Sequence, residues 1–300
     1  MGFRTLEIRR PAELHVTMGQ LTIEQEEGKV MIPLEDLTTI VCIGSNIRLS
    51  TLGMAQMARC GITVLMIDTT YKPAAVLLPV ESNARQALVM QKQISLSAVC
   101  KSELWQRIIR KKIENQARTL SILGLPGAEE VLNYVADLSE DNIDYTEALA
   151  AKRYFSYYHP GLNRRNDDSI NSRLNYGYGV VRNAIIRAVV LAGFQPAFGL
   201  HHCNQLNAFN LADDLIEPWR PFVDLIAYAS TETNIMLTKK QRYELAHVLH
   251  NACIVDGKKM TVLSGIDIMV ESLKNAVINE TTEIILPIII PVESLELINE

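Results

Sequence analysis

The spacing of apolar residues changes once along the chain, and this change constrains the fold more than any other feature. In the first eighty residues, apolar and polar positions alternate through RTLEIRR, ELHVT, LTIEQ and KVMIPL, with turn signals at Gly19-Gln20 and Glu27-Gly28. From about residue 90 the apolar positions recur at helical spacing. We therefore predict an α+β protein in which a β-rich N-terminal domain precedes a larger, all-helical C-terminal domain.

The N-terminal domain is expected to span 1–78. TTIVCIG and ITVLMID are typical of buried strands, and between them Ser50 can cap a short helix that Gly61 ends in a left-handed conformation. Residues 79–90 then form a linker. The helical domain spans 91–280, with a long first segment that has no helix breaker before Gly124. Further helices are predicted over 128–137, 145–158, 173–193, 209–230, 238–253 and 264–278.

The tail, 281–300, is a different kind of segment. Pro287 and Pro291 exclude a regular helix through EIILPIIIPVESLELINE, so we predict an extended apolar strip. It either packs on its own domain or adds to a partner as a strand. The five cysteines are scattered and show no zinc spacing, the first residues do not resemble a signal peptide, and no apolar run is long enough for a bilayer. We expect a cytoplasmic protein.

Charge is distributed unevenly. Residues 81–190 carry 15 basic and 12 acidic side chains, whereas residues 191–300 carry 7 and 14. One predicted helix has a basic face made by Arg107, Arg110, Lys111 and Arg118. This face is either solvated or follows a phosphate backbone. Glu114 lies within the face and weakens the second interpretation. Further candidate DNA contacts are Arg153, Arg164, Arg165 and Arg173.

The stretch GLHHCNQLNAFNLADDLIEPWRP, 199–221, carries the main chemical candidates. His201 and His202 precede a predicted helix on which Asp214 and Glu217, three residues apart, share a face. Pro218 bends the chain after Glu217. Glu147 lies in a second helix beside small residues that allow close packing. These groups either converge on a cation or have separate structural roles. In the second case, the acids at 214 and 217 form a solvated helix face, the histidine is structural, and Glu147 complements the dipole of its helix from the first turn. Spacing alone leaves both interpretations open.

A second histidine pair is less promising. His247 and His250 stand three apart, with Glu244 and Cys253 continuing the spacing. Because groups at spacing three fan around a helix, they do not converge as a tetrahedral zinc site requires.

Five stretches resemble one known family: GFRTLEIRRPAELHV, TLGMAQMARCGITVLMID, EALAAKRYF, LNYGYGVVRNAIIRAVVLAG and FGLHHCNQLNAFNLADDLIEPWRPFVD. It is the family of CRISPR-associated spacer-acquisition integrases, the larger of the two core adaptation proteins, and the similarity is greatest to the branch of type II systems. The last stretch is long and specific, and the resemblance covers nearly the whole chain.

The resemblance implies a divalent-cation site made by Glu147, His202 and Glu217, with Asp214 as a further acid and His201 as the alternative histidine. Relatives often have glycine where this chain has Ala148, and many have aspartate at the position of Glu217; neither change removes a ligand. An oxygen and imidazole ligand set suits Mg²⁺ or Mn²⁺.

The implied function is a metal-dependent DNA integrase that joins 3′-hydroxyl ends of captured fragments into the repeat array by transesterification, with nuclease activity at the same site. The implied partners are DNA, a second copy bound through the β-domain, the small ferredoxin-like adaptation protein and the type II effector nuclease. Two alternatives stay open: a structure-selective, metal-dependent DNA endonuclease, and a DNA-holding scaffold subunit.

Overall fold

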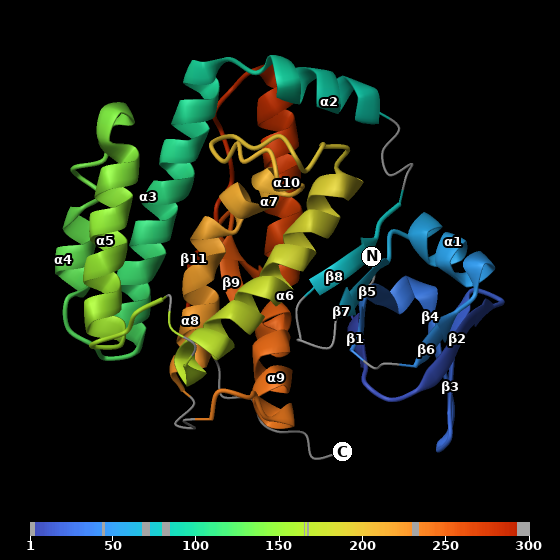
Figure 1. Ribbon diagram of the computed structural model, residues 1–300. Helices are drawn as coiled ribbons and strands as arrows, with labels where there is room; N and C mark the ends of the chain where they lie inside the picture. The colour runs from blue at the N-terminus through green and yellow to red at the C-terminus, as the bar shows by residue number, and fades with distance from the viewer. Residues whose placement is uncertain are drawn as a thin grey trace. The chain divides into compact units, whose positions relative to one another are not determined.

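The computed structural model describes residues 4–43, 46–67, 73–79, 85–164, 166, 168–229 and 234–292. The chain divides into two compact units: Met1–Ala87 with Val189–Phe194, and Leu88–Ala188 with Gln195–Glu300. Strands dominate the first unit and helices the second (Figure 1). The predicted α+β class is confirmed. Within the predicted linker, residues 80–84 lie outside the described residues.

Two four-stranded sheets build the first unit. In one, strand order is β1-β5-β7-β8, with β1, β5 and β7 parallel and β8 antiparallel. In the other, the order is β4-β3-β2-β6, an antiparallel meander joined by the parallel β6. The elements are β1 (Arg4–Ile8), β2 (Ala12–Thr17), β3 (Gln20–Gln25), β4 (Gly28–Pro33), η1 (Leu34–Asp36), β5 (Leu37–Cys42), β6 (Ile47–Leu49), β7 (Thr63–Ile67) and β8 (Pro73–Leu77).

One core joins both sheets to the helix α1 (Thr51–Arg59). It contains Leu14 and Leu21 from one sheet, Ile40 and Val64 from the other, and Met57 from the helix. The predicted helix ends are confirmed. The side chain of Ser50 accepts a hydrogen bond from the backbone N–H three residues later at 3.1 Å, and Gly61 follows the helix with φ +70°.

Helix α3 (Ala98–Ile122) is the central element of the second unit. It packs against α4 (Ala128–Asn133) and α5 (Ile143–Tyr158) on one side and against η3 (Glu217–Trp219) and α8 (Arg220–Tyr228) on the other (Figure 1). The predicted long first segment is broken into two, because α2 (Gln86–Ser95) ends before Ser97, whose side chain caps α3. A short turn, η2 (Glu140–Asn142), leads into α5.

The remaining helices of this unit are α6 (Ser169–Leu191), whose last turn falls in the first unit, α7 (Asn210–Leu215), α9 (Lys239–Ala246), η4 (His247–His250) and α10 (Val262–Asn279). The predicted helix over 209–230 is divided into α7, η3 and α8. Pro218 lies in η3 and Pro221 in the first turn of α8, as their lack of an N–H favours. Among the described residues, no helix is long and apolar enough to cross a bilayer.

A small sheet corrects the prediction that this domain is all helical. Its strands are β9 (Ala252–Val255), β10 (Lys258–Thr261) and β11 (Ile288–Ile289), in the order β10-β9-β11. The predicted helix over 238–253 therefore ends early. The tail is extended, and its strand β11 pairs antiparallel with β9, so this part packs on its own unit. Residues 293–300 of the predicted tail lie outside the described residues.

Candidate active site

A buried lysine forms ion pairs with both glutamates that the family resemblance implies as ligands. Lys112 lies on α3 and is 8% exposed. Its ammonium forms an ion pair with Oε1 of Glu147 and another, at 2.5 Å, with Oε2 of Glu217. Glu147 belongs to the second turn of α5, so the first-turn acid of that helix is Asp144 and not Glu147. Three separate elements thus meet at one charged point.

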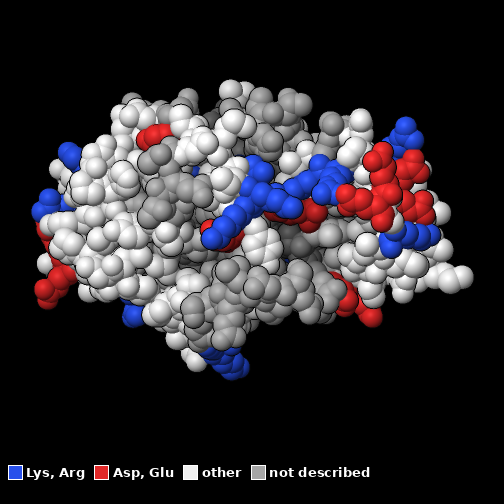
Figure 2. Space-filling view, turned by 90° about the horizontal axis from the view of Figure 1, so that it is seen from below, with Lys and Arg blue, Asp and Glu red and all other residues white. Residues whose placement is uncertain are grey.

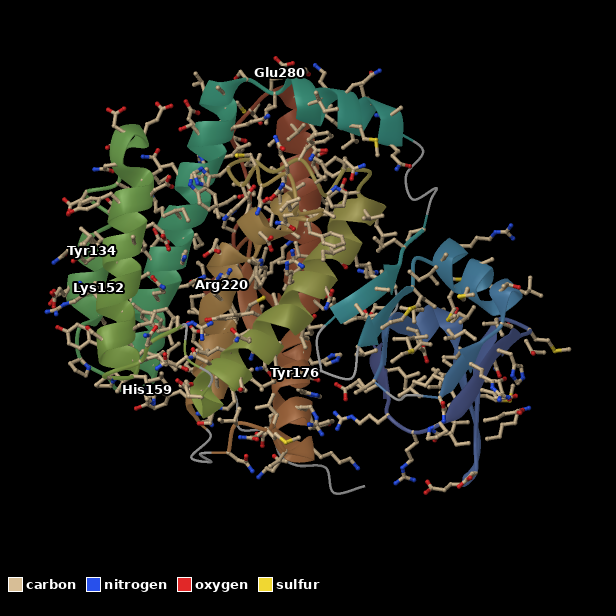
Figure 3. The ribbon with its side chains drawn as sticks, in the orientation of Figure 1. Tyr134, Lys152, His159, Tyr176, Arg220 and Glu280 are labelled. Carbon is tan, nitrogen blue, oxygen red and sulfur yellow. The ribbon has the colours of Figure 1, made fainter. Side chains whose placement is uncertain are left out.

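Arg220 adds a second positive charge to this point. Its Nε lies 2.8 Å from Oε1 of Glu217, and its guanidinium stacks 4.8 Å from the ring centroid of Tyr178. Figure 3 labels Arg220 among the helices of this unit, and its side chain is 33% exposed. Burial would raise the pKa of Glu217, but the charges of Arg220 and Lys112 outweigh it and lower that pKa to about 2. Burial would likewise lower the pKa of Lys112, yet Glu217 and Glu147 together raise it.

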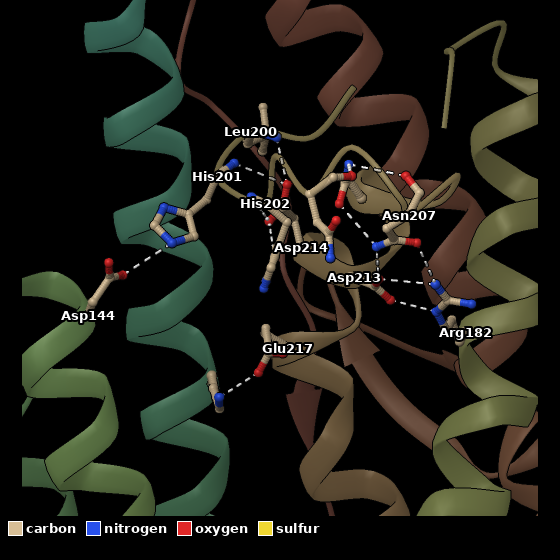
Figure 4. A network of polar contacts seen from close by, with 12 residues as sticks. Asp144, Arg182, Leu200, His201, His202, Asn207, Asp213, Asp214 and Glu217 are labelled. Carbon is tan, nitrogen blue, oxygen red and sulfur yellow. Dashed lines mark hydrogen bonds and ion pairs between the residues drawn. The ribbon is translucent and has the colours of Figure 1, made fainter. Parts of the chain in front are cut away.

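A second group of contacts forms around Asp214, which is fully buried near the end of α7. Its carboxylate accepts hydrogen bonds from the backbone N–H groups of Leu200 at 2.6 Å, His201 at 3.1 Å and His202 at 3.1 Å. It also lies 2.6 Å from Nδ1 of His202 (Figure 4). This hydrogen bond is the main cause of the raised pKa of His202, which burial opposes. Asp214 therefore fixes both the loop and the imidazole.

The two neighbouring histidines have different environments. The ring of His201 stacks on Trp105, with centroids 4.5 Å apart and planes within 2°. Its Nε2 lies 3.3 Å from Oδ1 of Asp144. The ring of His202 instead uses Nδ1 for Asp214, and none of the hydrogen bonds among the described residues involves its Nε2. His202 thus presents a free ring nitrogen.

The acids of the stretch 199–221 have different partners in the folded protein. The predicted common face of Asp214 and Glu217 does not give them common partners, since Asp214 contacts the histidine loop and Glu217 contacts Lys112 and Arg220. Asp213 faces away and pairs with Arg182 at 2.5 Å. Within the described ranges, no three His, Cys, Asp or Glu side chains are preassembled as a metal site, the pair His247 and His250 included.

The predicted basic face of α3 is only partly available to a ligand. Arg107 and Arg118 are exposed. Arg110 is half-buried and donates to the carbonyl of Val135 at 3.4 Å, and Lys111 forms an ion pair with Glu114.

The other basic candidates mostly have protein partners. Arg153 forms a hydrogen-bonded ion pair with Glu130. Arg164 donates to the side chains of Asn171 and Asn175. Arg173 is only 5% exposed, and Arg165 lies outside the described residues.

Sequence reasoning missed Lys112, although a signal for it exists. On α3 it shares the buried side with Leu104 and Ile108, and Asn115 and Thr119 continue the same stripe. Polar groups at the spacing of a buried apolar stripe must find partners inside the protein, because an unpaired buried charge is very costly. Such a stripe therefore indicates an internal polar site.

Sequence reasoning also missed the buried carboxylate of Asp224. It accepts hydrogen bonds from Tyr154 at 2.9 Å and Tyr178 at 2.5 Å, while the hydroxyl of Tyr158 donates to its backbone carbonyl at 2.8 Å. Burial raises the pKa of Asp224 to about 6. The network joins α5, α6 and α8, and through Tyr178 it supports Arg220.

The fold is shared with Cas1 proteins and casposases. A casposase bound to its integration product aligns over 94% of this chain and 92% of its own, with a TM-score of 0.76 and 18% identity. A Cas1 protein of Thermotoga maritima aligns over 93% and 99%, with a TM-score of 0.74 and 15% identity. The Cas6-RT-Cas1–Cas2 complex aligns over 93% of this chain and 35% of the matched chain, at a TM-score of 0.71 and 17% identity.

Sequence comparison specifies the family. The family described as CRISPR associated protein Cas1 matches residues 7–253. The CRISPR-associated endonuclease Cas1 of Neisseria meningitidis serogroup C (strain 8013) is 32% identical over 299 residues, covering 98% of both chains. The chain belongs to the Cas1 family, which confirms the resemblance found in the sequence.

Proposed function

We propose that this chain is a metal-dependent DNA integrase of CRISPR adaptation, which joins 3′-hydroxyl ends of captured DNA into the repeat array. With water in place of the hydroxyl, the same site acts as a nuclease. One observation carries the proposal: Glu147 and Glu217, from separate elements, converge on a single buried positive charge. The likeness of the fold to a casposase bound to its integration product supports the reaction class.

The donor set suits a divalent cation. Carboxylate oxygens favour Mg²⁺ or Mn²⁺, and an imidazole shifts the preference toward Mn²⁺. Glu147, His202 and Glu217 would hold the ion. Nδ1 of His202 is hydrogen-bonded to the buried Asp214. Metal-binding histidines typically make such a hydrogen bond to a carboxylate with the ring nitrogen that does not bind the metal. In this proposal Asp214 orients the ligand and is not itself a ligand, and His201, held by Trp105, is outside the site.

Each side chain has a defined task in transesterification. When bound, the cation supplies charge stabilisation at the phosphodiester and favours ionisation of the attacking oxygen. Glu147 and Glu217 provide the negative charge that attracts the ion. Arg220 keeps Glu217 in position through its ion pair, and Asp214 keeps the proton on Nδ1 of His202, so that Nε2 carries the lone pair.

Two surfaces support the proposed binding of DNA and of a second copy of the chain. Arg107 and Arg118 are the exposed members of the basic face on α3. On the face that Figure 2 displays, Lys and Arg side chains gather in one band beside a group of Asp and Glu side chains. The edge strand β4 exposes Val30 and Met31, which are 57% and 51% accessible, and supports a homodimer through the β-rich unit. The small ferredoxin-like adaptation protein and the type II effector nuclease are the further proposed partners.

The test is joining of a labelled 3′-hydroxyl duplex to a repeat-containing plasmid. Glu147→Ala, His202→Ala and Glu217→Ala should each reduce joining by about 100-fold or more, because each removes charge or a ligand from the reacting centre. Binding in gel-shift assays should persist. Mn²⁺ should support joining at least as well as Mg²⁺, and EDTA should stop it.

His201→Ala is the matched control and should retain most joining. Robust joining in EDTA, or near-normal joining by one of the three variants, would remove the metal or that residue from the proposal. Cleavage of branched substrates without any joining would favour the plain endonuclease. Binding with neither activity would favour the scaffold subunit.

A further inference from the structure

Lys112 lies between two of the side chains that would hold the proposed ion. Its ammonium contacts Oε1 of Glu147 and Oε2 of Glu217. Arg220 uses the opposite oxygen of Glu217, Oε1, and is held in place by its stacking on Tyr178. Of the two positive groups, Lys112 therefore blocks the gap between the carboxylates, while Arg220 lies outside it.

The charges at this point balance without any added ion. Two carboxylates face one ammonium and one guanidinium, and all four groups lie in or beside the interior of the unit. If Lys112 were absent, the two carboxylates would repel each other across the gap. If a divalent cation joined the complete set, the site would hold two excess positive charges, which is costly in a medium of low dielectric constant.

The side chain of lysine can resolve this conflict by moving. Its ammonium sits on a flexible four-carbon stem, unlike the planar and stacked guanidinium of Arg220. The side chain of Lys112 keeps 10% of its surface exposed, so the stem is not enclosed on every side. Departure of the ammonium would free both facing oxygens at once.

We propose that Lys112 is a built-in counter-cation: its ammonium holds Glu147 and Glu217 together in the metal-free protein and leaves the gap when a divalent cation binds. This rests on the proposed metal site and adds that the site's affinity is set by an internal competitor. Lys112 is a positioning residue in this scheme, because it keeps the ligands in place for the ion that replaces it.

Titration of EDTA-treated protein with Mn²⁺ tests the proposal. In Lys112→Met the apparent Kd for Mn²⁺, measured by calorimetry, should fall by about tenfold or more, since a unit charge a few ångströms away changes binding by at least that order. The metal-free variant should melt at a lower temperature than the metal-free wild type. Saturating Mn²⁺ should raise the Tm of the variant by more than it raises the Tm of the wild type. Lys111→Met, which removes a neighbouring lysine paired with Glu114, should leave the Kd unchanged.

A measurement on the unaltered protein covers the case in which Lys112→Met does not fold. Reductive methylation followed by peptide mapping should leave Lys112 protected without metal and should modify it in saturating Mg²⁺. A Kd that is unchanged or weaker in Lys112→Met, or equal protection of Lys112 with and without Mg²⁺, overturns the proposal. If Glu147→Ala binds Mn²⁺ as tightly as wild type, the proposed metal site itself fails, and this outcome is separate.

Discussion

At the scale of single residues, the histidine loop depends on one buried carboxylate. The carboxylate of Asp214 accepts hydrogen bonds from three backbone N–H groups and from the ring of His202. Its negative charge is therefore stabilised without a cation. The loop can close around Asp214 only if the chain passes very near it. A Cβ at Gly199 would lie 2.4 Å from the carbonyl oxygen of His202 and 2.6 Å from Oδ2 of Asp214.

Gly199→Ala should therefore displace His202. Because one of the obstructing atoms belongs to the backbone, we expect a decrease of about 1–3 kcal/mol in the free energy of unfolding, as for other overpacked sites, together with a large decrease in joining. Urea unfolding and the plasmid assay measure the two effects. Gly179→Ala, on α6 with no atom within 4 Å of its Cβ, should be neutral or slightly stabilising. Normal joining by Gly199→Ala would show that the loop tolerates the shift.

At the scale of elements, α3 connects the site to the C-terminal tail through Asn115. This fully buried side chain donates to the carbonyls of Pro218, at 2.9 Å, and Pro287, at 3.1 Å, and accepts from the N–H of Ile289 at 3.2 Å. A helix, the turn that carries Glu217, and the strand β11 are thus joined by one amide.

Asn115→Ala removes one hydrogen bond from each of three backbone groups, so it should destabilise the protein by several kcal/mol, with about 1–3 for each group that is left without another partner. Amide hydrogen exchange should show faster exchange at Ile289, and joining should fall because η3 loses support. Gln106→Ala, which removes one hydrogen bond to Leu138 at 3.2 Å from the same helix, is the milder control. Equal effects of the two substitutions would contradict the special role of Asn115.

Element types were predictable where a segment's own pattern decided them, as in α1 with its Ser50 cap and α10. The stretch after α9 was not, because β9 gains its partners from β10 and from the distant β11. The turn between β9 and β10 is Asp256-Gly257, with φ of 51° and 70°. An Asp-Gly pair is a strong hairpin signal, so the sequence did indicate the turn between β9 and β10, but it did not indicate the pairing of β9 with β11.

At the scale of the whole molecule, binding to DNA depends on which basic groups stay free after folding. Lys111 and Arg153 form ion pairs with carboxylates of the protein itself, so they are less available to phosphates. Arg107 and Arg118 remain exposed on α3. They are three turns apart on one face, about 16 Å along the axis, so each would contact a different phosphate.

Replacing Arg107 and Arg118 together by Gln should flatten the plot of log affinity for duplex DNA against log salt by roughly two units, because each phosphate that a side chain neutralises adds about 0.9 to the slope. Affinity should decrease similarly for unrelated sequences, because phosphate contacts carry no base information. Lys111→Gln is the control and should leave the slope nearly unchanged. An unchanged slope in the double variant would mean that this face of α3 is only solvated.

The two-part architecture, the bend after Glu217 and membership of the Cas1 family could be predicted from the sequence, because periodicity, prolines and long motifs are local properties of the chain. How the proposed site is built became visible in the folded protein. Lys112, Glu147 and Glu217 come from three elements, and their meeting depends on how α3, α5 and η3 pack. Spacing along a chain carries no information about that packing. For this reason, neither the ion pairs of Lys112 nor the hydrogen bonds of Asp214 to the histidine loop could be predicted from the sequence.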